Sequence, residues 1–156
     1  VIEAHPLIRV MEEALGKWPI STEITVQWGD MDALNHVNHT VYLTWMETVR
    51  MVYFDRCGMM EIFESENIGP ILAGIKADFL FPVVYPDTVV AHTTITRLGK
   101  SSFDMHYKIT SSRKEGRLVA TGTASGVMCN YSTGKSTPIS NSLRARIVEL
   151  ESMGKI

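Results

Sequence analysis

A long apolar helix followed by four strands is the pattern that most limits the fold of this chain. Residues 40–57 contain no glycine or proline, and Gly58 stands where a helix commonly ends. Apolar side chains cover most of the circumference of this predicted helix, which indicates that protein encloses it. A second, shorter helical piece is expected over residues 59–66.

Four long strands are predicted after the helices, and the connections between them are short. They cover residues 71–81, 87–98, 102–113 and 117–131. The turn signals are Pro82 with Pro86, Gly99-Lys100 and Glu115-Gly116. Long strands joined by short connections predict consecutive antiparallel hairpins.

Three further elements complete the predicted fold. Polar and apolar residues alternate over residues 22–28, so Val26 and Trp28 are expected on one face of a half-buried strand. Helical periodicity predicts an amphipathic helix over residues 6–15 and a terminal helix over residues 141–151. We therefore expect an α+β fold in which one curved antiparallel sheet wraps around the long helix.

Length and charge narrow the possible functions. The 156 residues suit one domain, which we divide into an N-terminal helical extension (1–20), a main domain (21–140) and a C-terminal helix (141–156). A net charge of −2 gives no sign of a nucleic-acid partner. No apolar run is long enough to span a membrane. Cys57 and Cys129 fit no zinc spacing and are expected to be reduced, which favours a cytoplasmic location.

The richest motif lies just before the long helix. Between Trp28 and Tyr42 the chain carries two aspartates, two histidines and two asparagines. The free backbone N–H groups at the start of the helix can hold an anion or a developing oxyanion. An acid or base beside them suits acyl transfer, with Asp32 attacking a carbonyl or activating a water.

The pattern Asp-x-Asp-x-x-x-His-Val-Asn-x-x-x-Tyr at residues 30–42 resembles that of the hotdog-fold acyl-CoA thioesterases. The likeness is greatest to the 4-hydroxybenzoyl-CoA thioesterase branch. It implies a catalytic carboxylate at Asp32 and a thioester carbonyl polarised by the backbone N–H of His39. It also implies hydrolysis of an acyl-CoA substrate without a cofactor, in a homodimer or homotetramer with active sites at the subunit interface.

The remaining candidates each have a structural alternative. His36 is a candidate catalytic residue that orients its neighbours, or a packed loop residue. Asn38 is expected first to cap the helix, and Tyr42 belongs to the core or to the acyl pocket. Many proteins of the resembling family place a basic-Ser element near the nucleotide end of CoA, which points to Lys100 and Ser101 here. A solvated turn is the alternative for these two residues.

Other functions remain open at this point. The chain also looks like plant acyl-ACP thioesterases, but Leu34 stands where they place an asparagine. His36-x-x-His39 with Asp30 and Asp32 could bind a metal, although the pair straddles the helix start; we expect no metal. A non-catalytic acyl-CoA-binding protein is the main rival. Glu47 and Arg50 are interpreted as an ordinary helix pair.

Overall fold

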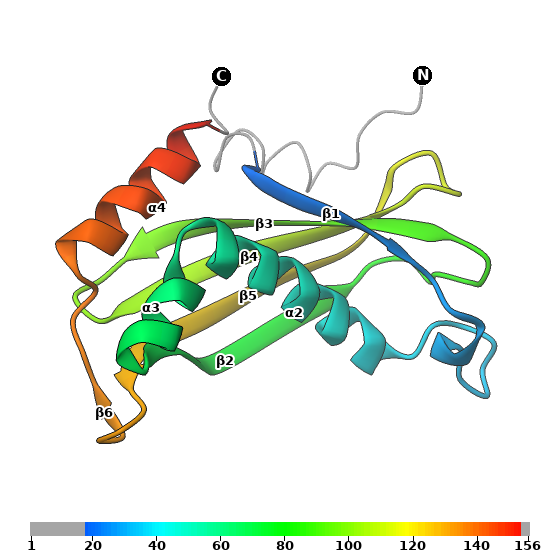
Figure 1. Cartoon of the computed structure of the whole chain (residues 1–156). Coiled ribbons are helices and arrows are strands. Elements are labelled where there is room, and N and C mark those ends of the chain that lie inside the picture. Colours follow the sequence, from blue (N-terminus) through cyan, green and yellow to red (C-terminus); the bar gives the residue numbers. More distant parts are fainter. Residues whose placement is uncertain (1–17, 154–156) are drawn as a thin grey trace.

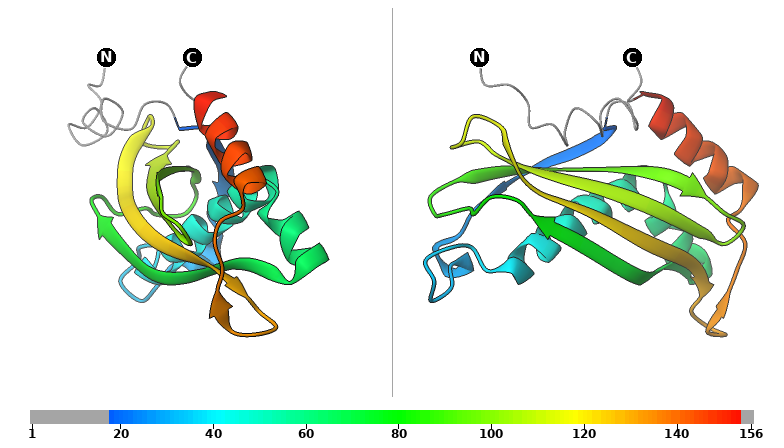
Figure 2. Two further views of the ribbon diagram at one scale, coloured as in Figure 1. Left: turned by 90° about the vertical axis from the view of Figure 1, so that its left-hand side faces the viewer. Right: turned by 180° about the vertical axis from the view of Figure 1, so that it is seen from behind.

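One strongly curved sheet with a long helix in its concave face makes up the computed structural model, which describes residues 18–153. The strand order is β1-β3-β4-β5-β2, with β6 paired to β5. Figures 1 and 2 show the sheet curling around α2. The elements are β1 (Ile20–Thr25), the 3-10 helix η1 (Trp28–Asp30), α2 (His39–Arg56), α3 (Met59–Glu66), β2 (Ile68–Phe79), β3 (Thr88–Leu98), β4 (Ser102–Ser111), β5 (Arg117–Asn130), β6 (Lys135–Ser136) and α4 (Asn141–Met153).

The predicted central helix is confirmed, and local signals set both of its ends. Asn38 caps its first turn through the side chain. Gly58 follows it with φ +86°, a left-handed conformation that glycine adopts without strain. The buried side chains of α2 are Tyr42, Trp45, Met46, Val49, Arg50, Tyr53 and Phe54. They cover a wide arc, so the expectation that protein encloses this helix is also confirmed.

The helix approaches the sheet closely at Gly122 of β5. A Cβ at this position would lie 2.8 Å from Met46 Sδ and 3.0 Å from the carbonyl oxygen of Lys76. Met46 is fully buried, so its side chain has little room to move aside. Gly122 therefore sets how deeply α2 sits in the concave face.

The prediction of consecutive hairpins is correct for β3, β4 and β5 but wrong for β2. Strand β2 pairs with β5, while β3 pairs with β1. The segment 80–87 thus crosses from the edge strand β2 to β3, the strand next to the other edge strand β1, past the start of α2. Its backbone forms hydrogen bonds to the loop before α2 and to the sheet. The Val83 carbonyl accepts the Val37 N–H, and the Leu80 N–H donates to the Val119 carbonyl of β5. A short connection therefore joins two strands that are not neighbours, because the sheet curls far enough to bring the end of β2 near the start of β3.

The first strand ends earlier than predicted. Strand β1 stops at Thr25, and Val26 N–H instead donates to the Asp87 carbonyl at 2.9 Å. The chain then turns into η1, which leaves the Trp28 side chain 76% exposed. The predicted place of Trp28 on one strand face with Val26 is therefore wrong, since the alternating pattern continues past the point where the backbone leaves the sheet.

Helix α4 closes the end of β3 that extends beyond β1. Its Glu151 carboxylate accepts the Tyr53 hydroxyl and the Thr94 hydroxyl, both at 2.6 Å, and the Ile95 N–H at 2.8 Å. Burial, together with this carboxylate, holds the pKa of Tyr53 far above its ordinary value.

The predicted helix over residues 6–15 lies outside the described residues. Among residues 18–153, no helix is both long enough and apolar enough to cross a membrane.

Candidate active site

The segment between β1 and α2 is a braced loop at one end of the sheet (Figure 1). Asp30 Oδ2 accepts the Gln27 N–H at 2.8 Å, and the Asp30 carbonyl accepts the Asn38 N–H at 2.9 Å. An isolated β-bridge joins Met31 to Val37. Asp30 therefore holds the two ends of the loop together, which is a structural role.

Asp32 lies in the tight turn that this bridge encloses. Its N–H donates to the His36 carbonyl at 2.9 Å, and its Oδ1 accepts the Leu34 N–H at 2.8 Å. Asn35 completes the turn with φ 61°, which asparagine tolerates better than most residues. The Asp32 side chain is half-buried. Its Oδ1 holds the turn, and its Oδ2 lies toward the start of α2.

Asn38 joins this carboxylate to the start of α2. Its Oδ1 accepts the Thr40 N–H at 3.0 Å and the Thr40 hydroxyl at 2.6 Å, as a helix cap does. Its Nδ2 donates to Asp32 Oδ2 at 3.2 Å. One amide therefore positions both the helix terminus and the candidate catalytic carboxylate.

The first backbone N–H of α2 belongs to His39. The next two N–H groups are occupied: Thr40 donates to the Asn38 side chain, and Val41 donates to the Asn38 carbonyl at 3.0 Å. Within residues 18–153 the His39 N–H has no acceptor. It lies at the helix end that carries partial positive charge, where a substrate oxygen can accept from it.

The two histidines and Tyr42 have different surroundings. His36 is exposed and supports the Asp32 turn through its carbonyl. The His39 imidazole packs edge-on against Phe79 at 6.1 Å between ring centroids. Tyr42 is buried, and its hydroxyl accepts the Val83 N–H at 3.1 Å. Burial raises the pKa of Tyr42, which therefore serves the core and supports the loop behind the site.

Lys100 and Ser101 lie at the opposite end of the sheet from Asp32. They form the turn between β3 and β4, beside α4, whereas α2 begins at the far end (Figures 1 and 2). Arg144 Nη2 donates to the Gly99 carbonyl at 2.8 Å, and the carbonyls of Lys100 and Ser101 each accept a backbone N–H at the same distance. A single chain thus brings Asp32, His36, Asn38, His39 and Tyr42 together but leaves Lys100 and Ser101 apart from them.

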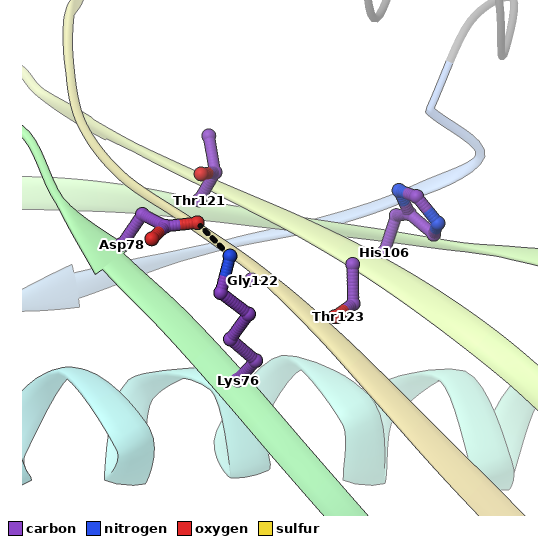
Figure 3. Close-up of a pocket in the computed structure, with 6 residues that line it drawn as sticks. All are labelled: Lys76, Asp78, His106, Thr121, Gly122 and Thr123. Carbon is purple, nitrogen blue, oxygen red and sulfur yellow. Dashed lines mark hydrogen bonds and ion pairs between the residues drawn. The ribbon is translucent and has the colours of Figure 1, made fainter.

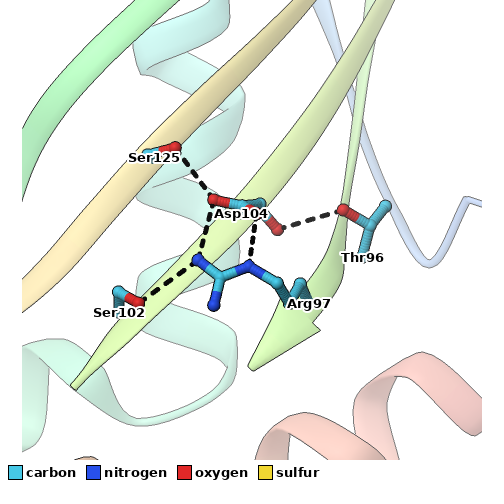
Figure 4. Close-up of polar contacts among 5 residues, drawn as sticks. All are labelled: Thr96, Arg97, Ser102, Asp104 and Ser125. Carbon is cyan, nitrogen blue, oxygen red and sulfur yellow. Dashed lines mark hydrogen bonds and ion pairs between the residues drawn. The ribbon is translucent and has the colours of Figure 1, made fainter. Parts of the chain in front are cut away.

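The base of that turn is a closed polar network (Figure 4). Arg97 Nη2 donates to Asp104 Oδ1 at 3.1 Å and to the Ser102 hydroxyl at 3.2 Å, and Ser125 donates to Asp104 at 2.8 Å. The Arg97 guanidinium holds the pKa of Asp104 below its usual range. Asp104 thus balances the charge of Arg97, while Lys100 has no ion pair among the described residues and is exposed.

Arg50 does not form the helix pair with Glu47 that the sequence predicts. It is 8% exposed, and its Nη1 donates to the Tyr107 hydroxyl at 3.1 Å across the core. Glu47 is exposed, and no ion pair joins the two in the described structure. The helical spacing predicted a neighbour on the same helix, whereas the contact comes from β4.

The convex face of the sheet carries a separate hollow of about 200 Å³ (Figure 3). Its lining residues are Lys76, Asp78, His106, Thr121, Gly122 and Thr123. Most of these side chains point away from α2, and the Lys76 ammonium pairs with Asp78 at 3.1 Å. Burial lowers the pKa of His106. The hollow lies across the sheet from the helix and is separate from the Asp32 site.

The two histidines do not form a metal-binding group with the nearby carboxylates. In the part of the chain from residue 18 to 153, no set of three or more His, Cys, Asp or Glu side chains is arranged to hold a metal ion. The Asp32 oxygens instead accept Leu34 N–H and Asn38 Nδ2. The arrangement offers a carboxylate and a helix terminus.

Comparison with known proteins agrees with this geometry. The thioesterase-like superfamily matches residues 26–147. A solved thioesterase from Thermus thermophilus, complexed with coenzyme A and Zn, is 29% identical; the match covers 88% of this chain and 97% of that one, with a TM-score of 0.77. A gentisyl-coenzyme A thioesterase structure is 25% identical over 81% of this chain and 98% of its own, with a TM-score of 0.71.

A curated relative is similar over nearly all of its length. The long-chain acyl-CoA thioesterase FadM of Escherichia coli K12 is 23% identical, and the match covers 84% of this chain and 98% of FadM. The curved sheet with its enclosed helix and the similarity to these thioesterases define a thioesterase of the hotdog class. The chain belongs to the thioesterase-like superfamily.

Proposed function

We propose that this thioesterase hydrolyses an acyl-CoA thioester to the free acid and CoA, with Asp32 as the nucleophile or general base. The observation that carries the proposal is the Asn38 amide, which links Asp32 Oδ2 to the terminus of α2. A thioester carbonyl that accepts from the His39 N–H lies next to the carboxylate. This is the geometry that addition to a carbonyl needs.

In the general-base route, Asp32 removes a proton from a water as its oxygen adds to the carbonyl carbon. Negative charge develops on the carbonyl oxygen, where the His39 N–H and the helix terminus stabilise it. Collapse of the intermediate breaks the C–S bond, and the CoA thiolate takes the proton from Asp32. The products are the acid and free CoA, with the carboxylate restored.

In the nucleophilic route, an Asp32 oxygen adds to the carbonyl and displaces the CoA thiolate, which leaves a mixed anhydride. Water then hydrolyses the anhydride to release the acid and regenerate Asp32. Both routes use the same carboxylate and the same backbone donor. His36 contributes by fixing the turn through its carbonyl. Neither route uses a cofactor.

An exposed edge strand supports a homodimer as the working form. Strand β2 lies at the edge of the sheet, with Ile71, Leu72 and Phe79 each more than 40% exposed. Such an edge offers unpaired backbone groups to another strand. We infer that β2 pairs antiparallel with β2 of a second copy; pairing of two such dimers gives the alternative tetramer.

This pairing gives a role to Lys100 and Ser101. A two-fold axis reverses the direction of the second copy, so its turn between β3 and β4 lies at the same end as Asp32 of the first. Lys100 there can pair with a phosphate of CoA bound to the first copy, with Ser101 beside it. The substrate is then held at the helix terminus that Asn38 caps, with Tyr42 supporting the loop behind it, and by the second copy near the nucleotide.

Release of thiol from a panel of aromatic, short and long acyl-CoAs tests the proposal. Turnover of at least one acyl-CoA, lost in Asp32→Asn, supports it. Tight binding of acyl-CoA without turnover in the parent protein would replace it with the rival, a non-catalytic acyl-CoA-binding protein. The same panel on acyl carrier protein decides the carrier, and cell fractionation tests the proposed cytoplasmic location.

A further inference from the structure

A hollow on the same chain, beside the loop of Asp32, is not used by the proposed reaction. It has a volume of about 470 Å³, within the range of small-molecule sites. Three segments form its walls: the end of β1, the crossing segment before β3, and the turn between β4 and β5. Its lining residues are Thr25, Val26, Tyr85, Pro86, Asp87, Thr88, Ser112 and Arg113.

The turn between β4 and β5, together with the first residue of β5, carries three cations within five positions: Arg113, Lys114 and Arg117. None of the three forms an ion pair with a described residue. Arg113 Nη1 donates to the Pro86 carbonyl at 3.2 Å, which holds the guanidinium at the wall of the hollow. The Arg113 side chain retains further N–H donors for a ligand.

Phe81 positions the other two cations. The Arg117 guanidinium lies 3.6 Å from the centroid of its ring, and the Lys114 ammonium lies 5.9 Å from it. Stacking occupies the face of the guanidinium and leaves its edge N–H groups available, which suits the binding of a phosphate. Two carboxylates lie nearby, Glu115 in the turn and Asp87 in the wall.

Asp87 already has three donors. Its Oδ1 accepts the Thr88 N–H at 2.7 Å and the Arg113 N–H at 2.9 Å, and its Oδ2 accepts the Ser111 hydroxyl. These bonds satisfy the carboxylate oxygens of Asp87 within the wall. The three cations outnumber the two nearby carboxylates, and one of these carboxylates already accepts three hydrogen bonds. The turn therefore presents a net positive surface.

The hollow is connected to the candidate active site by short contacts. The Tyr85 N–H donates to Met31 Sδ at 3.4 Å, and Met31 directly precedes Asp32. Phe79 touches the His39 ring, and two residues later Phe81 lies under Arg117. A pantetheine arm is as long as four or five extended residues, ~15 Å, so the thioester and the nucleotide of one CoA molecule bind at separate places.

We propose that this hollow binds the nucleotide end of the coenzyme A carrier. Arg113, with Lys114 and Arg117 at the margin, takes a phosphate, and the half-exposed Tyr85 ring stacks on the adenine. The hydroxyls of Thr25, Thr88 and Ser112 line the space between them. The inference rests on the proposed use of acyl-CoA. Because CoA carries phosphate at two places, a second contact at Lys100 is compatible with it.

Equilibrium binding of adenosine 3′,5′-bisphosphate, the nucleotide fragment of CoA, tests this site without requiring turnover. Calorimetry on the parent protein should detect binding that acyl-CoA displaces. Arg113→Ala and Tyr85→Ala should each weaken it about tenfold, whereas Arg113→Lys should keep most of it. Arg56→Ala is the matched control, since Arg56 is an exposed cation at the opposite end of α2.

Kinetics on two substrates provide the second measurement. The KM for acyl-CoA should rise about tenfold in Arg113→Ala, while the KM for acyl-pantetheine, which lacks the nucleotide, stays unchanged. Unchanged bisphosphate binding in both Arg113→Ala and Tyr85→Ala, with folded protein, overturns the proposal. Equal weakening of both substrates also overturns it. Failure to hydrolyse any thioester would instead count against the proposed function, because nucleotide binding is measured separately.

Discussion

The Asn38 Nδ2 group donates to Asp32 Oδ2 at 3.2 Å, while Oδ1 of the same amide accepts the Thr40 N–H. These two functions can be separated by substitution. Serine is as good a helix cap as asparagine, but it has no N–H to offer the carboxylate. Asn38→Ser should keep the melting temperature close to that of the parent and lower kcat. Asn38→Ala should lower both, with loss of the cap costing about 1 kcal/mol.

Thermal unfolding and steady-state kinetics on the two Asn38 variants check this expectation. Equal kcat for Asn38→Ser and the parent would mean that Asp32 needs no amide to orient it. A destabilised serine variant would mean that the cap depends on geometry that only asparagine provides.

The substitution Asp32→Asn should lower kcat roughly a hundredfold or more, because an amide is a poor base and a poor nucleophile. The amide oxygen can still accept the Leu34 N–H, so the turn is expected to persist. Asp30→Asn is the control, since that carboxylate accepts the Gln27 N–H and lies outside the proposed chemistry. Circular dichroism checks the fold, and undiminished turnover of Asp32→Asn would remove Asp32 from the mechanism.

Activity should survive prolonged treatment with EDTA. In the proposed mechanism the helix terminus supplies the electrophile for the carbonyl oxygen, and the oxygens of Asp32 accept hydrogen bonds from Leu34 and Asn38. The measurement is the rate of thiol release before and after chelation, with metal content determined on the same samples. Loss of activity that one divalent ion restores would reassign His36 and His39 to a metal site.

Lys100→Ala should raise the KM for acyl-CoA with little change in kcat, because a distant phosphate contact binds ground state and transition state alike. The effect should shrink in high salt, since exposed charges are screened. Arg56→Ala serves as the control for loss of one exposed cation outside the proposed β2 interface. Wild-type KM for the Lys100 variant in low salt would leave this turn without a role in substrate binding.

The Cys57 thiol should resist alkylation at neutral pH in the folded protein. Burial raises its pKa to about 11, against an ordinary value of 9.0. Two units of pKa lower the thiolate fraction about a hundredfold, and the side chain is also inaccessible. Mass spectrometry after iodoacetamide treatment, with and without urea, measures the difference. Modification of Cys57 in native protein at the rate of a free thiol would contradict the buried position.

The parts of the fold that depend on neighbouring residues could be predicted from the sequence. Helix α2 begins and ends within one residue of its predicted limits because the cap at Asn38 and the glycine at position 58 act locally. The Asp32 turn and the helix terminus were also predicted as neighbours, since only a few residues separate them. Their hydrogen bonds confirm that proximity, while their catalytic roles remain proposals.

Contacts between distant segments could not be predicted in this way. The pairing of β2 with β5 depends on the curl of the whole sheet, which the length of the segment 80–87 does not reveal. Arg50 meets Tyr107 across 57 positions, and a helical periodicity offers only neighbours three or four residues away. In the sequence, residues 113–117 look like an ordinary charged turn. Only the fold shows that Phe81 and the crossing segment pack against these cations.

Because α2 provides both the core and the proposed oxyanion donor, changes of acyl preference made on this helix will tend to cost stability. Phe79 offers another route. It contacts His39 and Tyr42 at the reacting end, yet it is the last residue of β2 and lies outside the helix itself. Laboratory evolution of substrate range should therefore tolerate far more amino acids at Phe79 than at Met46, where the packing against Gly122 leaves almost no freedom.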